Sequence, residues 1–176
     1  MNQSTSLPEP WLRGTLTEVP AVQRAVLHSL QAAEEELAKW CSQLTGEEIH
    51  LRPFRLASVA FHLRHIPGSV DRLLTYAEGR ELSGEQLAAM KAESDPGDNA
   101  GDLLAKLSSA LQSAAERVRR FTPADFDQPR EVGRKHLPTS VGGLLVHLAD
   151  HTQRHVGQAI TTARLLLVSP RVTEHP

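Results

Sequence analysis

The chain has 176 residues, enough for one domain with a substantial core, and a formal net charge of −2. Such a charge offers no electrostatic footprint for nucleic acid or an anionic membrane, and no apolar run approaches the roughly 20 residues of a membrane span. The single Cys41 excludes an internal disulfide and fits a reducing compartment. From these features together we expect a soluble, cytoplasmic protein that binds neither nucleic acid nor membrane.

The two ends of the chain are polar and are predicted to lie outside the folded domain. Residues 1–16 are expected to form a tail or lead-in loop. They have neither a basic start nor an apolar run, so they do not read as a signal peptide. Residues 17–168 are expected to form a single helical domain, and residues 169–176 a C-terminal tail.

Hydrophobic residues recur at helical spacing in four long segments and one short one. The second long helix is expected to open near Ala57 or Ser58, with Ser58 as its cap. Ser83-Gly-Glu-Gln86 is a capping-box pattern that opens the short helix, and Thr139 or Ser140 caps the last helix. The expected ranges are 20–44, 58–79, 84–93, 99–121 and 140–167.

Two features modify this helical pattern. Pro67 removes one backbone hydrogen bond inside the second helix and is expected to kink it just after His65. Residues 122–138 contain three prolines and are predicted as a long irregular connection. Since no segment reads as a strand of convincing length, the fold class is all-α, a four-helix bundle with a short extra helix between its second and third long helices.

The last helix carries a row of histidines, His147, His151 and His155, each four residues from the next. A step of four residues advances the side chain by about 40° around a helix, so the three lie along one face. Leucines fall near that face, and the row is therefore expected to point inward. Neighbouring pairs in it are close enough to share a metal ion.

The second helix adds His62 and His65, which two facing helices of a bundle could bring to the same ion. Neutral imidazole suits zinc, nickel, copper or iron(II), and three protein nitrogens leave coordination positions open for chemistry. The residues alone leave an alternative, because buried imidazoles also need hydrogen-bond partners. That alternative is a buried network joining His151 and His155 to neighbouring polar side chains, namely Asp150, Thr152 and Gln158.

Two segments of the sequence resemble the DinB/YfiT-like superfamily. The segment T-S-V-G-G-L-L-V-H-L-A-D-H-T-Q-R-H-V-G-Q, residues 139–158, is similar to the last-helix signature, in which a leucine-rich start leads to H-i-a-e-H-x-x-H-H-x-G-Q or a near variant. Leu51-Arg-Pro53 followed by Ser58-Val-Ala-Phe-His-Leu-Arg-His65 resembles the segment in which a serine stands seven residues before a metal histidine. The Pro67-Gly68 pair departs from the acidic or polar residues usual there.

The resemblance implies an up-down-down-up bundle and a divalent transition metal, Zn, Ni or Fe, held by three histidines. By position these ligands are His65, His151 and His155, and the serine offset favours His65 over His62. His147 matches a position that does not bind the metal, and we expect it to support the site. In the H-x-G-Q tail, Gln158 is expected to orient a ligand or a water, and Gly157 to permit a close helix approach.

Some relatives are thiol-dependent S-transferases, so the resemblance implies a metal-dependent enzyme acting with a low-molecular-weight thiol or another small molecule. Two alternatives stay open: a metal-dependent hydrolase, and a non-catalytic, stress-associated binding module with a structural ion. Asp71 and Asp150, the nearest carboxylates for a hydrolytic base, are expected to face outward. We also expect a homodimer, the commonest oligomer.

Overall fold

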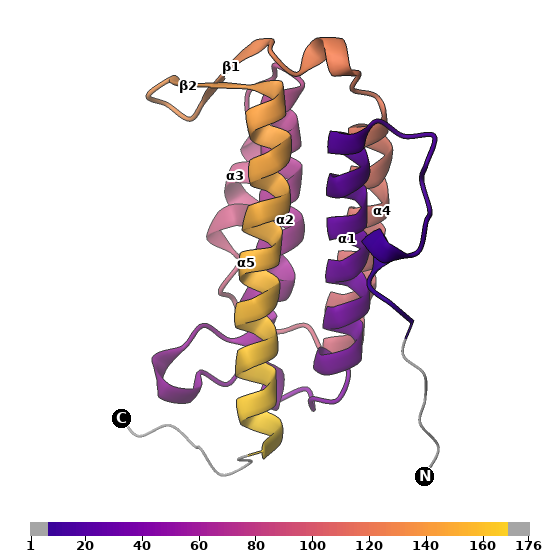
Figure 1. Cartoon of the computed structure of the whole chain (residues 1–176). Helices are drawn as coiled ribbons and strands as arrows, with labels where there is room; N and C mark the ends of the chain where they lie inside the picture. The colour runs from indigo at the N-terminus through magenta and orange to yellow at the C-terminus, as the bar shows by residue number, and fades with distance from the viewer. Residues whose placement is uncertain (1–6, 169–176) are drawn as a thin grey trace.

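The computed structural model describes residues 7–168 and shows a mainly helical chain, as predicted (Figure 1). Each long helix packs on two others: α5 lies against α1 and α2, and α4 lies against the same two helices from the other side. In Figure 1, α1 and α5 run in one direction and α2 and α4 in the opposite one. The four long helices are α1 (Ala21–Cys41), α2 (Val59–Ala77), α4 (Ala100–Arg119) and α5 (Val141–Val168).

The core lies between these four helices and is built mainly from leucine. Each helix contributes side chains that are at most 2% exposed, including Leu37, Leu63, Leu107, Leu145 and Leu148. Burying one such side chain contributes about 1.5–3 kcal/mol to folding. Within residues 7–168, no helix has both the length and the apolar character needed to cross a membrane.

The predicted start signals cap the helices. The Ser58 side chain accepts a hydrogen bond from the Phe61 amide at 3.2 Å, which satisfies one free N–H at the start of α2. Ser83 and Gln86 form the predicted reciprocal capping box on the short helix α3 (Gly84–Lys91), which packs on α2. At the other end of α2, Gly79 adopts a φ of 74°, a left-handed conformation that glycine reaches without steric cost.

Replacing Ser58 with alanine should lower the free energy of unfolding by about 1 kcal/mol, the usual cost of a lost N-terminal cap. Urea denaturation would measure the change. Ser58→Asp is the matched control, because aspartate also accepts from the first turn and should leave the stability within a few tenths of a kcal/mol. Equal losses in both variants would contradict the capping role.

The prediction for residues 122–138 was wrong in part, because this segment and the two residues after it include a β-hairpin. A 3₁₀ turn, η4 (Pro123–Asp125), precedes strands β1 (Pro129–Val132) and β2 (Leu137–Ser140), which pair antiparallel with Val132 opposite Leu137. Both strands have a free edge, where proline is tolerated. Four residues per strand are too few to give a readable hydrophobic alternation, and all eight strand residues are at least partly exposed.

Helix α2 continues through Pro67 without a break, so the predicted kink does not interrupt it. Proline still removes one backbone hydrogen bond there. The turns on either side are held by Ile66 and Val70, which are 0% and 2% exposed in the core. Packing therefore outweighs the lost bond.

Part of the predicted N-terminal lead-in lies against α1. A 3₁₀ turn, η1 (Pro10–Leu12), contacts α1, and Arg13 pairs with Glu35 through two hydrogen bonds of 2.7 and 2.6 Å. Further 3₁₀ turns, η2 (Glu48–His50) and η3 (Pro53–Arg55), lie in the α1–α2 connection. The predicted C-terminal tail, 169–176, lies outside the described residues.

Candidate metal centre

Three histidines converge from two helices that pack against each other, α2 and α5. His65 comes from α2, and His151 and His155 come from adjacent turns of α5. One ring nitrogen from each lies within 4.8 Å of the others. The Nε2 atoms of His65 and His151 are 3.0 Å apart, and the ring centroid of His155 lies 4.3 Å from that of His65 and 4.5 Å from that of His151.

This spacing fits a shared metal ion. Zinc–nitrogen bonds of about 2.0–2.1 Å at ligand angles between octahedral and tetrahedral place two ligand nitrogens roughly 2.9–3.4 Å apart. The 3.0 Å between the Nε2 atoms of His65 and His151 falls in that range. Three imidazole nitrogens are also a donor set that zinc, nickel and iron(II) accept. The residues present therefore suit a divalent transition metal.

The site favours neutral imidazoles. Burial, followed by the nearby His155 and His65, lowers the pKa of His151 to about 4. Burial and then the charge of His65 lower the pKa of His155 as well. A metal binds the lone pair of an unprotonated ring nitrogen, so lowered pKa values keep both side chains competent to bind at neutral pH.

His62, the competing candidate on α2, lies behind this cluster. Its side chain is 2% exposed, and its Nδ1 lies 3.1 Å from Nδ1 of His155. One of these two nitrogens must donate to the other. If His155 donates, its Nε2 keeps a lone pair for a metal, and His62 then acts by orienting the His155 ring.

His147, Gly157 and Gln158 do not belong to the three-histidine cluster. His147 is exposed, and its ring centroid lies 5.5 Å from that of His151. Gln158 is exposed too, and its predicted role toward a ligand stays a prediction. The role predicted for Gly157 was wrong, because a Cβ atom added there would meet nothing within 4 Å. Among residues 7–168, no neighbouring helix approaches closely enough to require glycine there.

The alternative hydrogen-bond network does not form. Asp150 instead pairs with Arg154 at 2.6 Å on the exposed face of α5. Thr152 is buried, but its hydroxyl has no hydrogen-bond partner among the described residues. Within residues 7–168, no hydrogen bond joins His151 or His155 to the polar side chains proposed for this network.

A buried carboxylate that sequence reasoning missed touches the cluster. Glu93 follows α3 and is 7% exposed. Its Oε2 lies 2.7 Å from Nδ1 of His65, and its Oε1 accepts from Nη1 of Arg72 at 2.9 Å. Burial alone would raise the pKa of Glu93, but these two partners outweigh burial and hold the pKa below its usual range. Nothing in the sequence around residue 93 marks it as a site residue.

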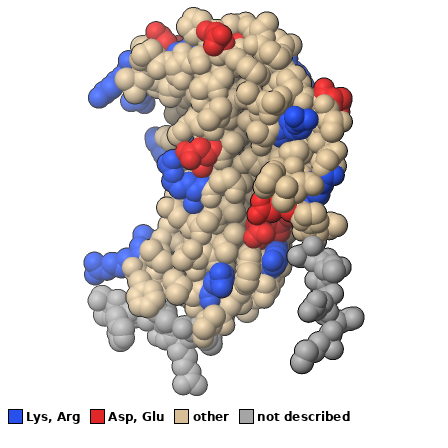
Figure 2. All heavy atoms as spheres, viewed as in Figure 1, with Lys and Arg blue, Asp and Glu red and all other residues tan. Residues whose placement is uncertain are grey.

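The arginines nearest the site in sequence are already paired. Arg64 lies 3.6 Å from a carboxylate oxygen of Asp98, and Arg72 and Arg154 bind Glu93 and Asp150 as described. On the face seen in Figure 2, basic and acidic side chains are interspersed over the described residues. That face shows no broad patch of one sign.

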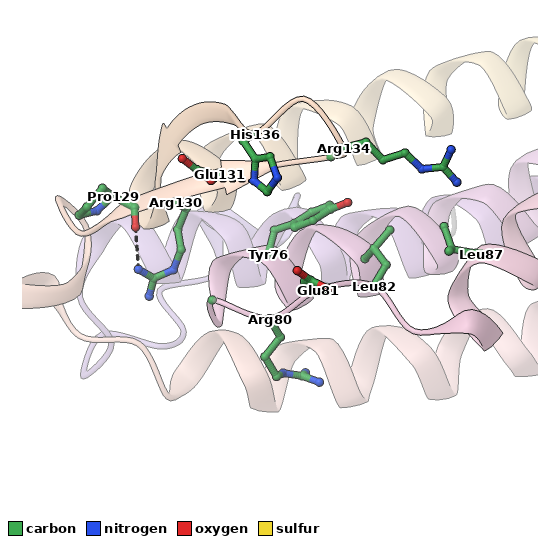
Figure 3. Close-up of a pocket in the computed structure, with 12 residues that line it drawn as sticks. Tyr76, Arg80, Glu81, Leu82, Leu87, Pro129, Arg130, Glu131, Arg134 and His136 are labelled. Atoms are coloured by element: carbon green, nitrogen blue, oxygen red, sulfur yellow. Dashed lines mark hydrogen bonds and ion pairs between the residues drawn. The ribbon is translucent and has the colours of Figure 1, made fainter.

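A cavity lies away from the three candidate ligands, between the hairpin and the C-terminal end of α2 (Figure 3). It has a volume of about 790 Å³. Tyr76 on its floor is eleven residues beyond His65, or about 16 Å along the helix axis. Its lining mixes apolar, basic and acidic side chains, including Leu82, Leu87, Arg130, Arg134, Glu131 and His136. A small ligand on the three histidines would not reach it.

Comparison with known proteins identifies the family. A family model for the DinB superfamily matches residues 29–159, which is well over half of the chain and includes His65, His151 and His155. A search of curated proteins found no matching relative. The matched segment also contains α2, α3 and α4 in full. The chain therefore belongs to the DinB superfamily.

Proposed function

We propose that this chain binds a divalent transition metal, Zn, Ni or Fe, through His65, His151 and His155, and acts as a metal-dependent enzyme of the thiol S-transferase type. The observation that supports this proposal is the convergence of three imidazole nitrogens within 4.8 Å. A bound ion with three protein ligands would supply an open position at which a thiol loses its proton and becomes a nucleophile. The bundle itself we assign to the up-down-down-up type, with α3 as the added helix.

Neighbouring side chains restrain the candidate ligands and leave them accessible to a small molecule. The Phe61 ring stacks on His65, with centroids 5.2 Å apart and planes 17° from parallel, and so restrains the ligand ring. The three candidate ligands are partly exposed, so a small molecule can approach them from solvent. His62, which is only 2% exposed, lies against His155 on the buried side of the cluster.

The hydrolase alternative lacks a free carboxylate base among the carboxylates considered for it in residues 7–168. Glu93 is occupied by His65 and Arg72. Asp71 was expected to face outward; its two oxygens accept from Arg117 and Gln86 at 2.6 Å each. A carboxylate held in this way is not free to activate water. No observation among the described residues favours hydrolysis over thiol chemistry.

A cobalt-substituted protein would test the proposal. We expect one equivalent of Co²⁺ to bind, and addition of a small thiol such as 2-mercaptoethanol to produce a sulfur-to-cobalt charge-transfer band, because a thiolate fills the open position. His151→Ala is the control and should show no such band. A spectrum that saturating thiol leaves unchanged would favour the alternative of a structural ion in a non-catalytic binding module.

A further inference from the structure

The segment that departs from the superfamily pattern, Pro67-Gly68, lies beside the buried carboxylate of Glu93. We propose that Glu93 is a positioning residue that fixes the orientation and the tautomer of the His65 ring. Arg72 holds the Glu93 carboxylate by a hydrogen bond, and Gly68 leaves the space that the two side chains occupy. This inference rests on the proposed metal site, since its consequence is a correctly presented His65 nitrogen. It also makes a claim about the metal-free protein, which can be tested separately.

The contacts determine which nitrogen of His65 is free. An ionised carboxylate can only accept hydrogen bonds. Glu93 Oε2 is 2.7 Å from Nδ1 of His65, so Nδ1 carries the proton and donates it. In the neutral ring the opposite nitrogen, Nε2, has the lone pair, and it is this atom that lies 3.0 Å from Nε2 of His151. The carboxylate thus turns the metal-binding nitrogen of His65 toward its partner ligand.

Arg72 holds the carboxylate in place. It stands seven residues after His65 on α2, two turns along the same face, and donates to Oε1 of Glu93 at 2.9 Å. The side chains of Glu93 and Arg72 are only 9% and 11% exposed, so each needs the other as a charge partner. Each carboxylate oxygen has one partner from α2, and this fixes the carboxylate plane as well as its position.

Gly68 makes room for this arrangement. It lies between His65 and Arg72 on α2, and a Cβ atom there would come within 3.0 Å of Nη1 of Arg72 and 3.1 Å of Oε1 of Glu93. Both contacts are tighter than those that Cβ atoms ordinarily make, so a methyl group there would push the ends of the Arg72 and Glu93 side chains away by a few tenths of an ångström. Glycine inside a helix is unfavourable compared with alanine. The close approach of the two charged groups gives that glycine a structural reason.

A purely structural role for Glu93, pinning the α3–α4 connection to α2, must be distinguished from a positioning role. Asp98 provides the matched control, because it lies in the same connection and pairs with Arg64 of α2 without touching a candidate ligand. Gly157 provides the second control. It is a helical glycine on α5, two residues after His155, and a Cβ atom there would meet nothing.

The experiment compares Glu93→Gln and Gly68→Ala with Asp98→Asn and Gly157→Ala, after circular dichroism has shown that each variant is folded. Zinc affinity is measured by competition with a chromophoric chelator. We expect Glu93→Gln to bind Zn²⁺ about 10–100-fold more weakly than the wild type, the usual effect of losing a partner of a metal ligand. Gly68→Ala should lose a smaller part of this affinity, because it shifts the ends of the Arg72 and Glu93 side chains without removing either. The two controls should bind as the wild type does.

Nitrogen NMR of the metal-free proteins at neutral pH supplies the second readout. In the wild type, we expect the proton of His65 on Nδ1, and in Glu93→Gln and Gly68→Ala a shift of that proton toward Nε2. If the wild type fails to bind zinc, the proposed function is overturned. The tautomer of His65 in the metal-free proteins then still tests whether Glu93 positions that ring. Wild-type zinc affinity together with an unchanged tautomer in either folded variant would overturn the inference itself.

Discussion

Replacing His151 with alanine is expected to weaken zinc binding by at least about 100-fold. Structural zinc sites bind with on the order of 10 kcal/mol, and a share of roughly 3 kcal/mol for each of three ligands corresponds to about two decades in Kd. His151 is central to the cluster, since its Nε2 lies 3.0 Å from that of His65 and its ring centroid 4.5 Å from that of His155. Isothermal titration calorimetry with Zn²⁺ would measure the loss.

The companion variants test each assignment. His65→Ala and His155→Ala should lose affinity to a similar extent. His62→Gln should lose less, because His62 contacts only the far nitrogen of His155. The exposed His136, which pairs with Glu131 in the hairpin, serves as the control, and His136→Ala should bind zinc normally. Full metal occupancy in the triple variant of His65, His151 and His155, measured by elemental analysis, would refute the ligand set.

Replacing Leu145 with alanine is expected to lower the free energy of unfolding by about 2–5 kcal/mol. The side chain is 0% exposed and belongs to the core shared by the four long helices. Truncation loses its burial and leaves a cavity that the packed helices can close only in part. A loss of this size is a large fraction of the stability of an ordinary domain. Chemical denaturation monitored by circular dichroism would measure it.

The neighbouring residue on α5 gives the control. Val146 is 58% exposed, so Val146→Ala removes little buried surface and should change the free energy of unfolding by no more than about 0.5 kcal/mol. Similar losses for Leu145→Ala and Val146→Ala would contradict the described packing of α5. Both variants retain the candidate ligands, so zinc affinity should fall in neither while the protein stays folded.

The helices could be predicted because their signals are local. Apolar residues at helical spacing and side chains such as Ser58 and Ser83 act within one or two turns, and the predicted boundaries agree with the structure to within a few residues. The hairpin was missed for the converse reason. Strands β1 and β2 contain four residues each, and their pairing depends on a turn at Gly133 with a φ of 70° rather than on hydrophobic alternation.

The candidate site was only partly visible in the sequence. The spacing of His151 and His155 predicts that they share a face, but steps of about 40° accumulate, so His147 points away from the centre of the cluster. The choice of His65 over His62 depends on how α2 is rotated toward α5. Spacing did not determine that rotation, and the resemblance supplied it. Glu93 comes from a connection whose path no local pattern predicts.

Metal-edge anomalous diffraction from a crystal of the zinc-loaded protein would locate the ion and its protein ligands together. We expect one peak, with a nitrogen of His65, His151 and His155 each about 2.0–2.1 Å from it and no fourth protein ligand. The nitrogen from His65 should be Nε2, with Nδ1 still bonded to Glu93. No zinc peak among the three histidines, or a peak bound by His62 in place of His65, would refute the proposed metal site.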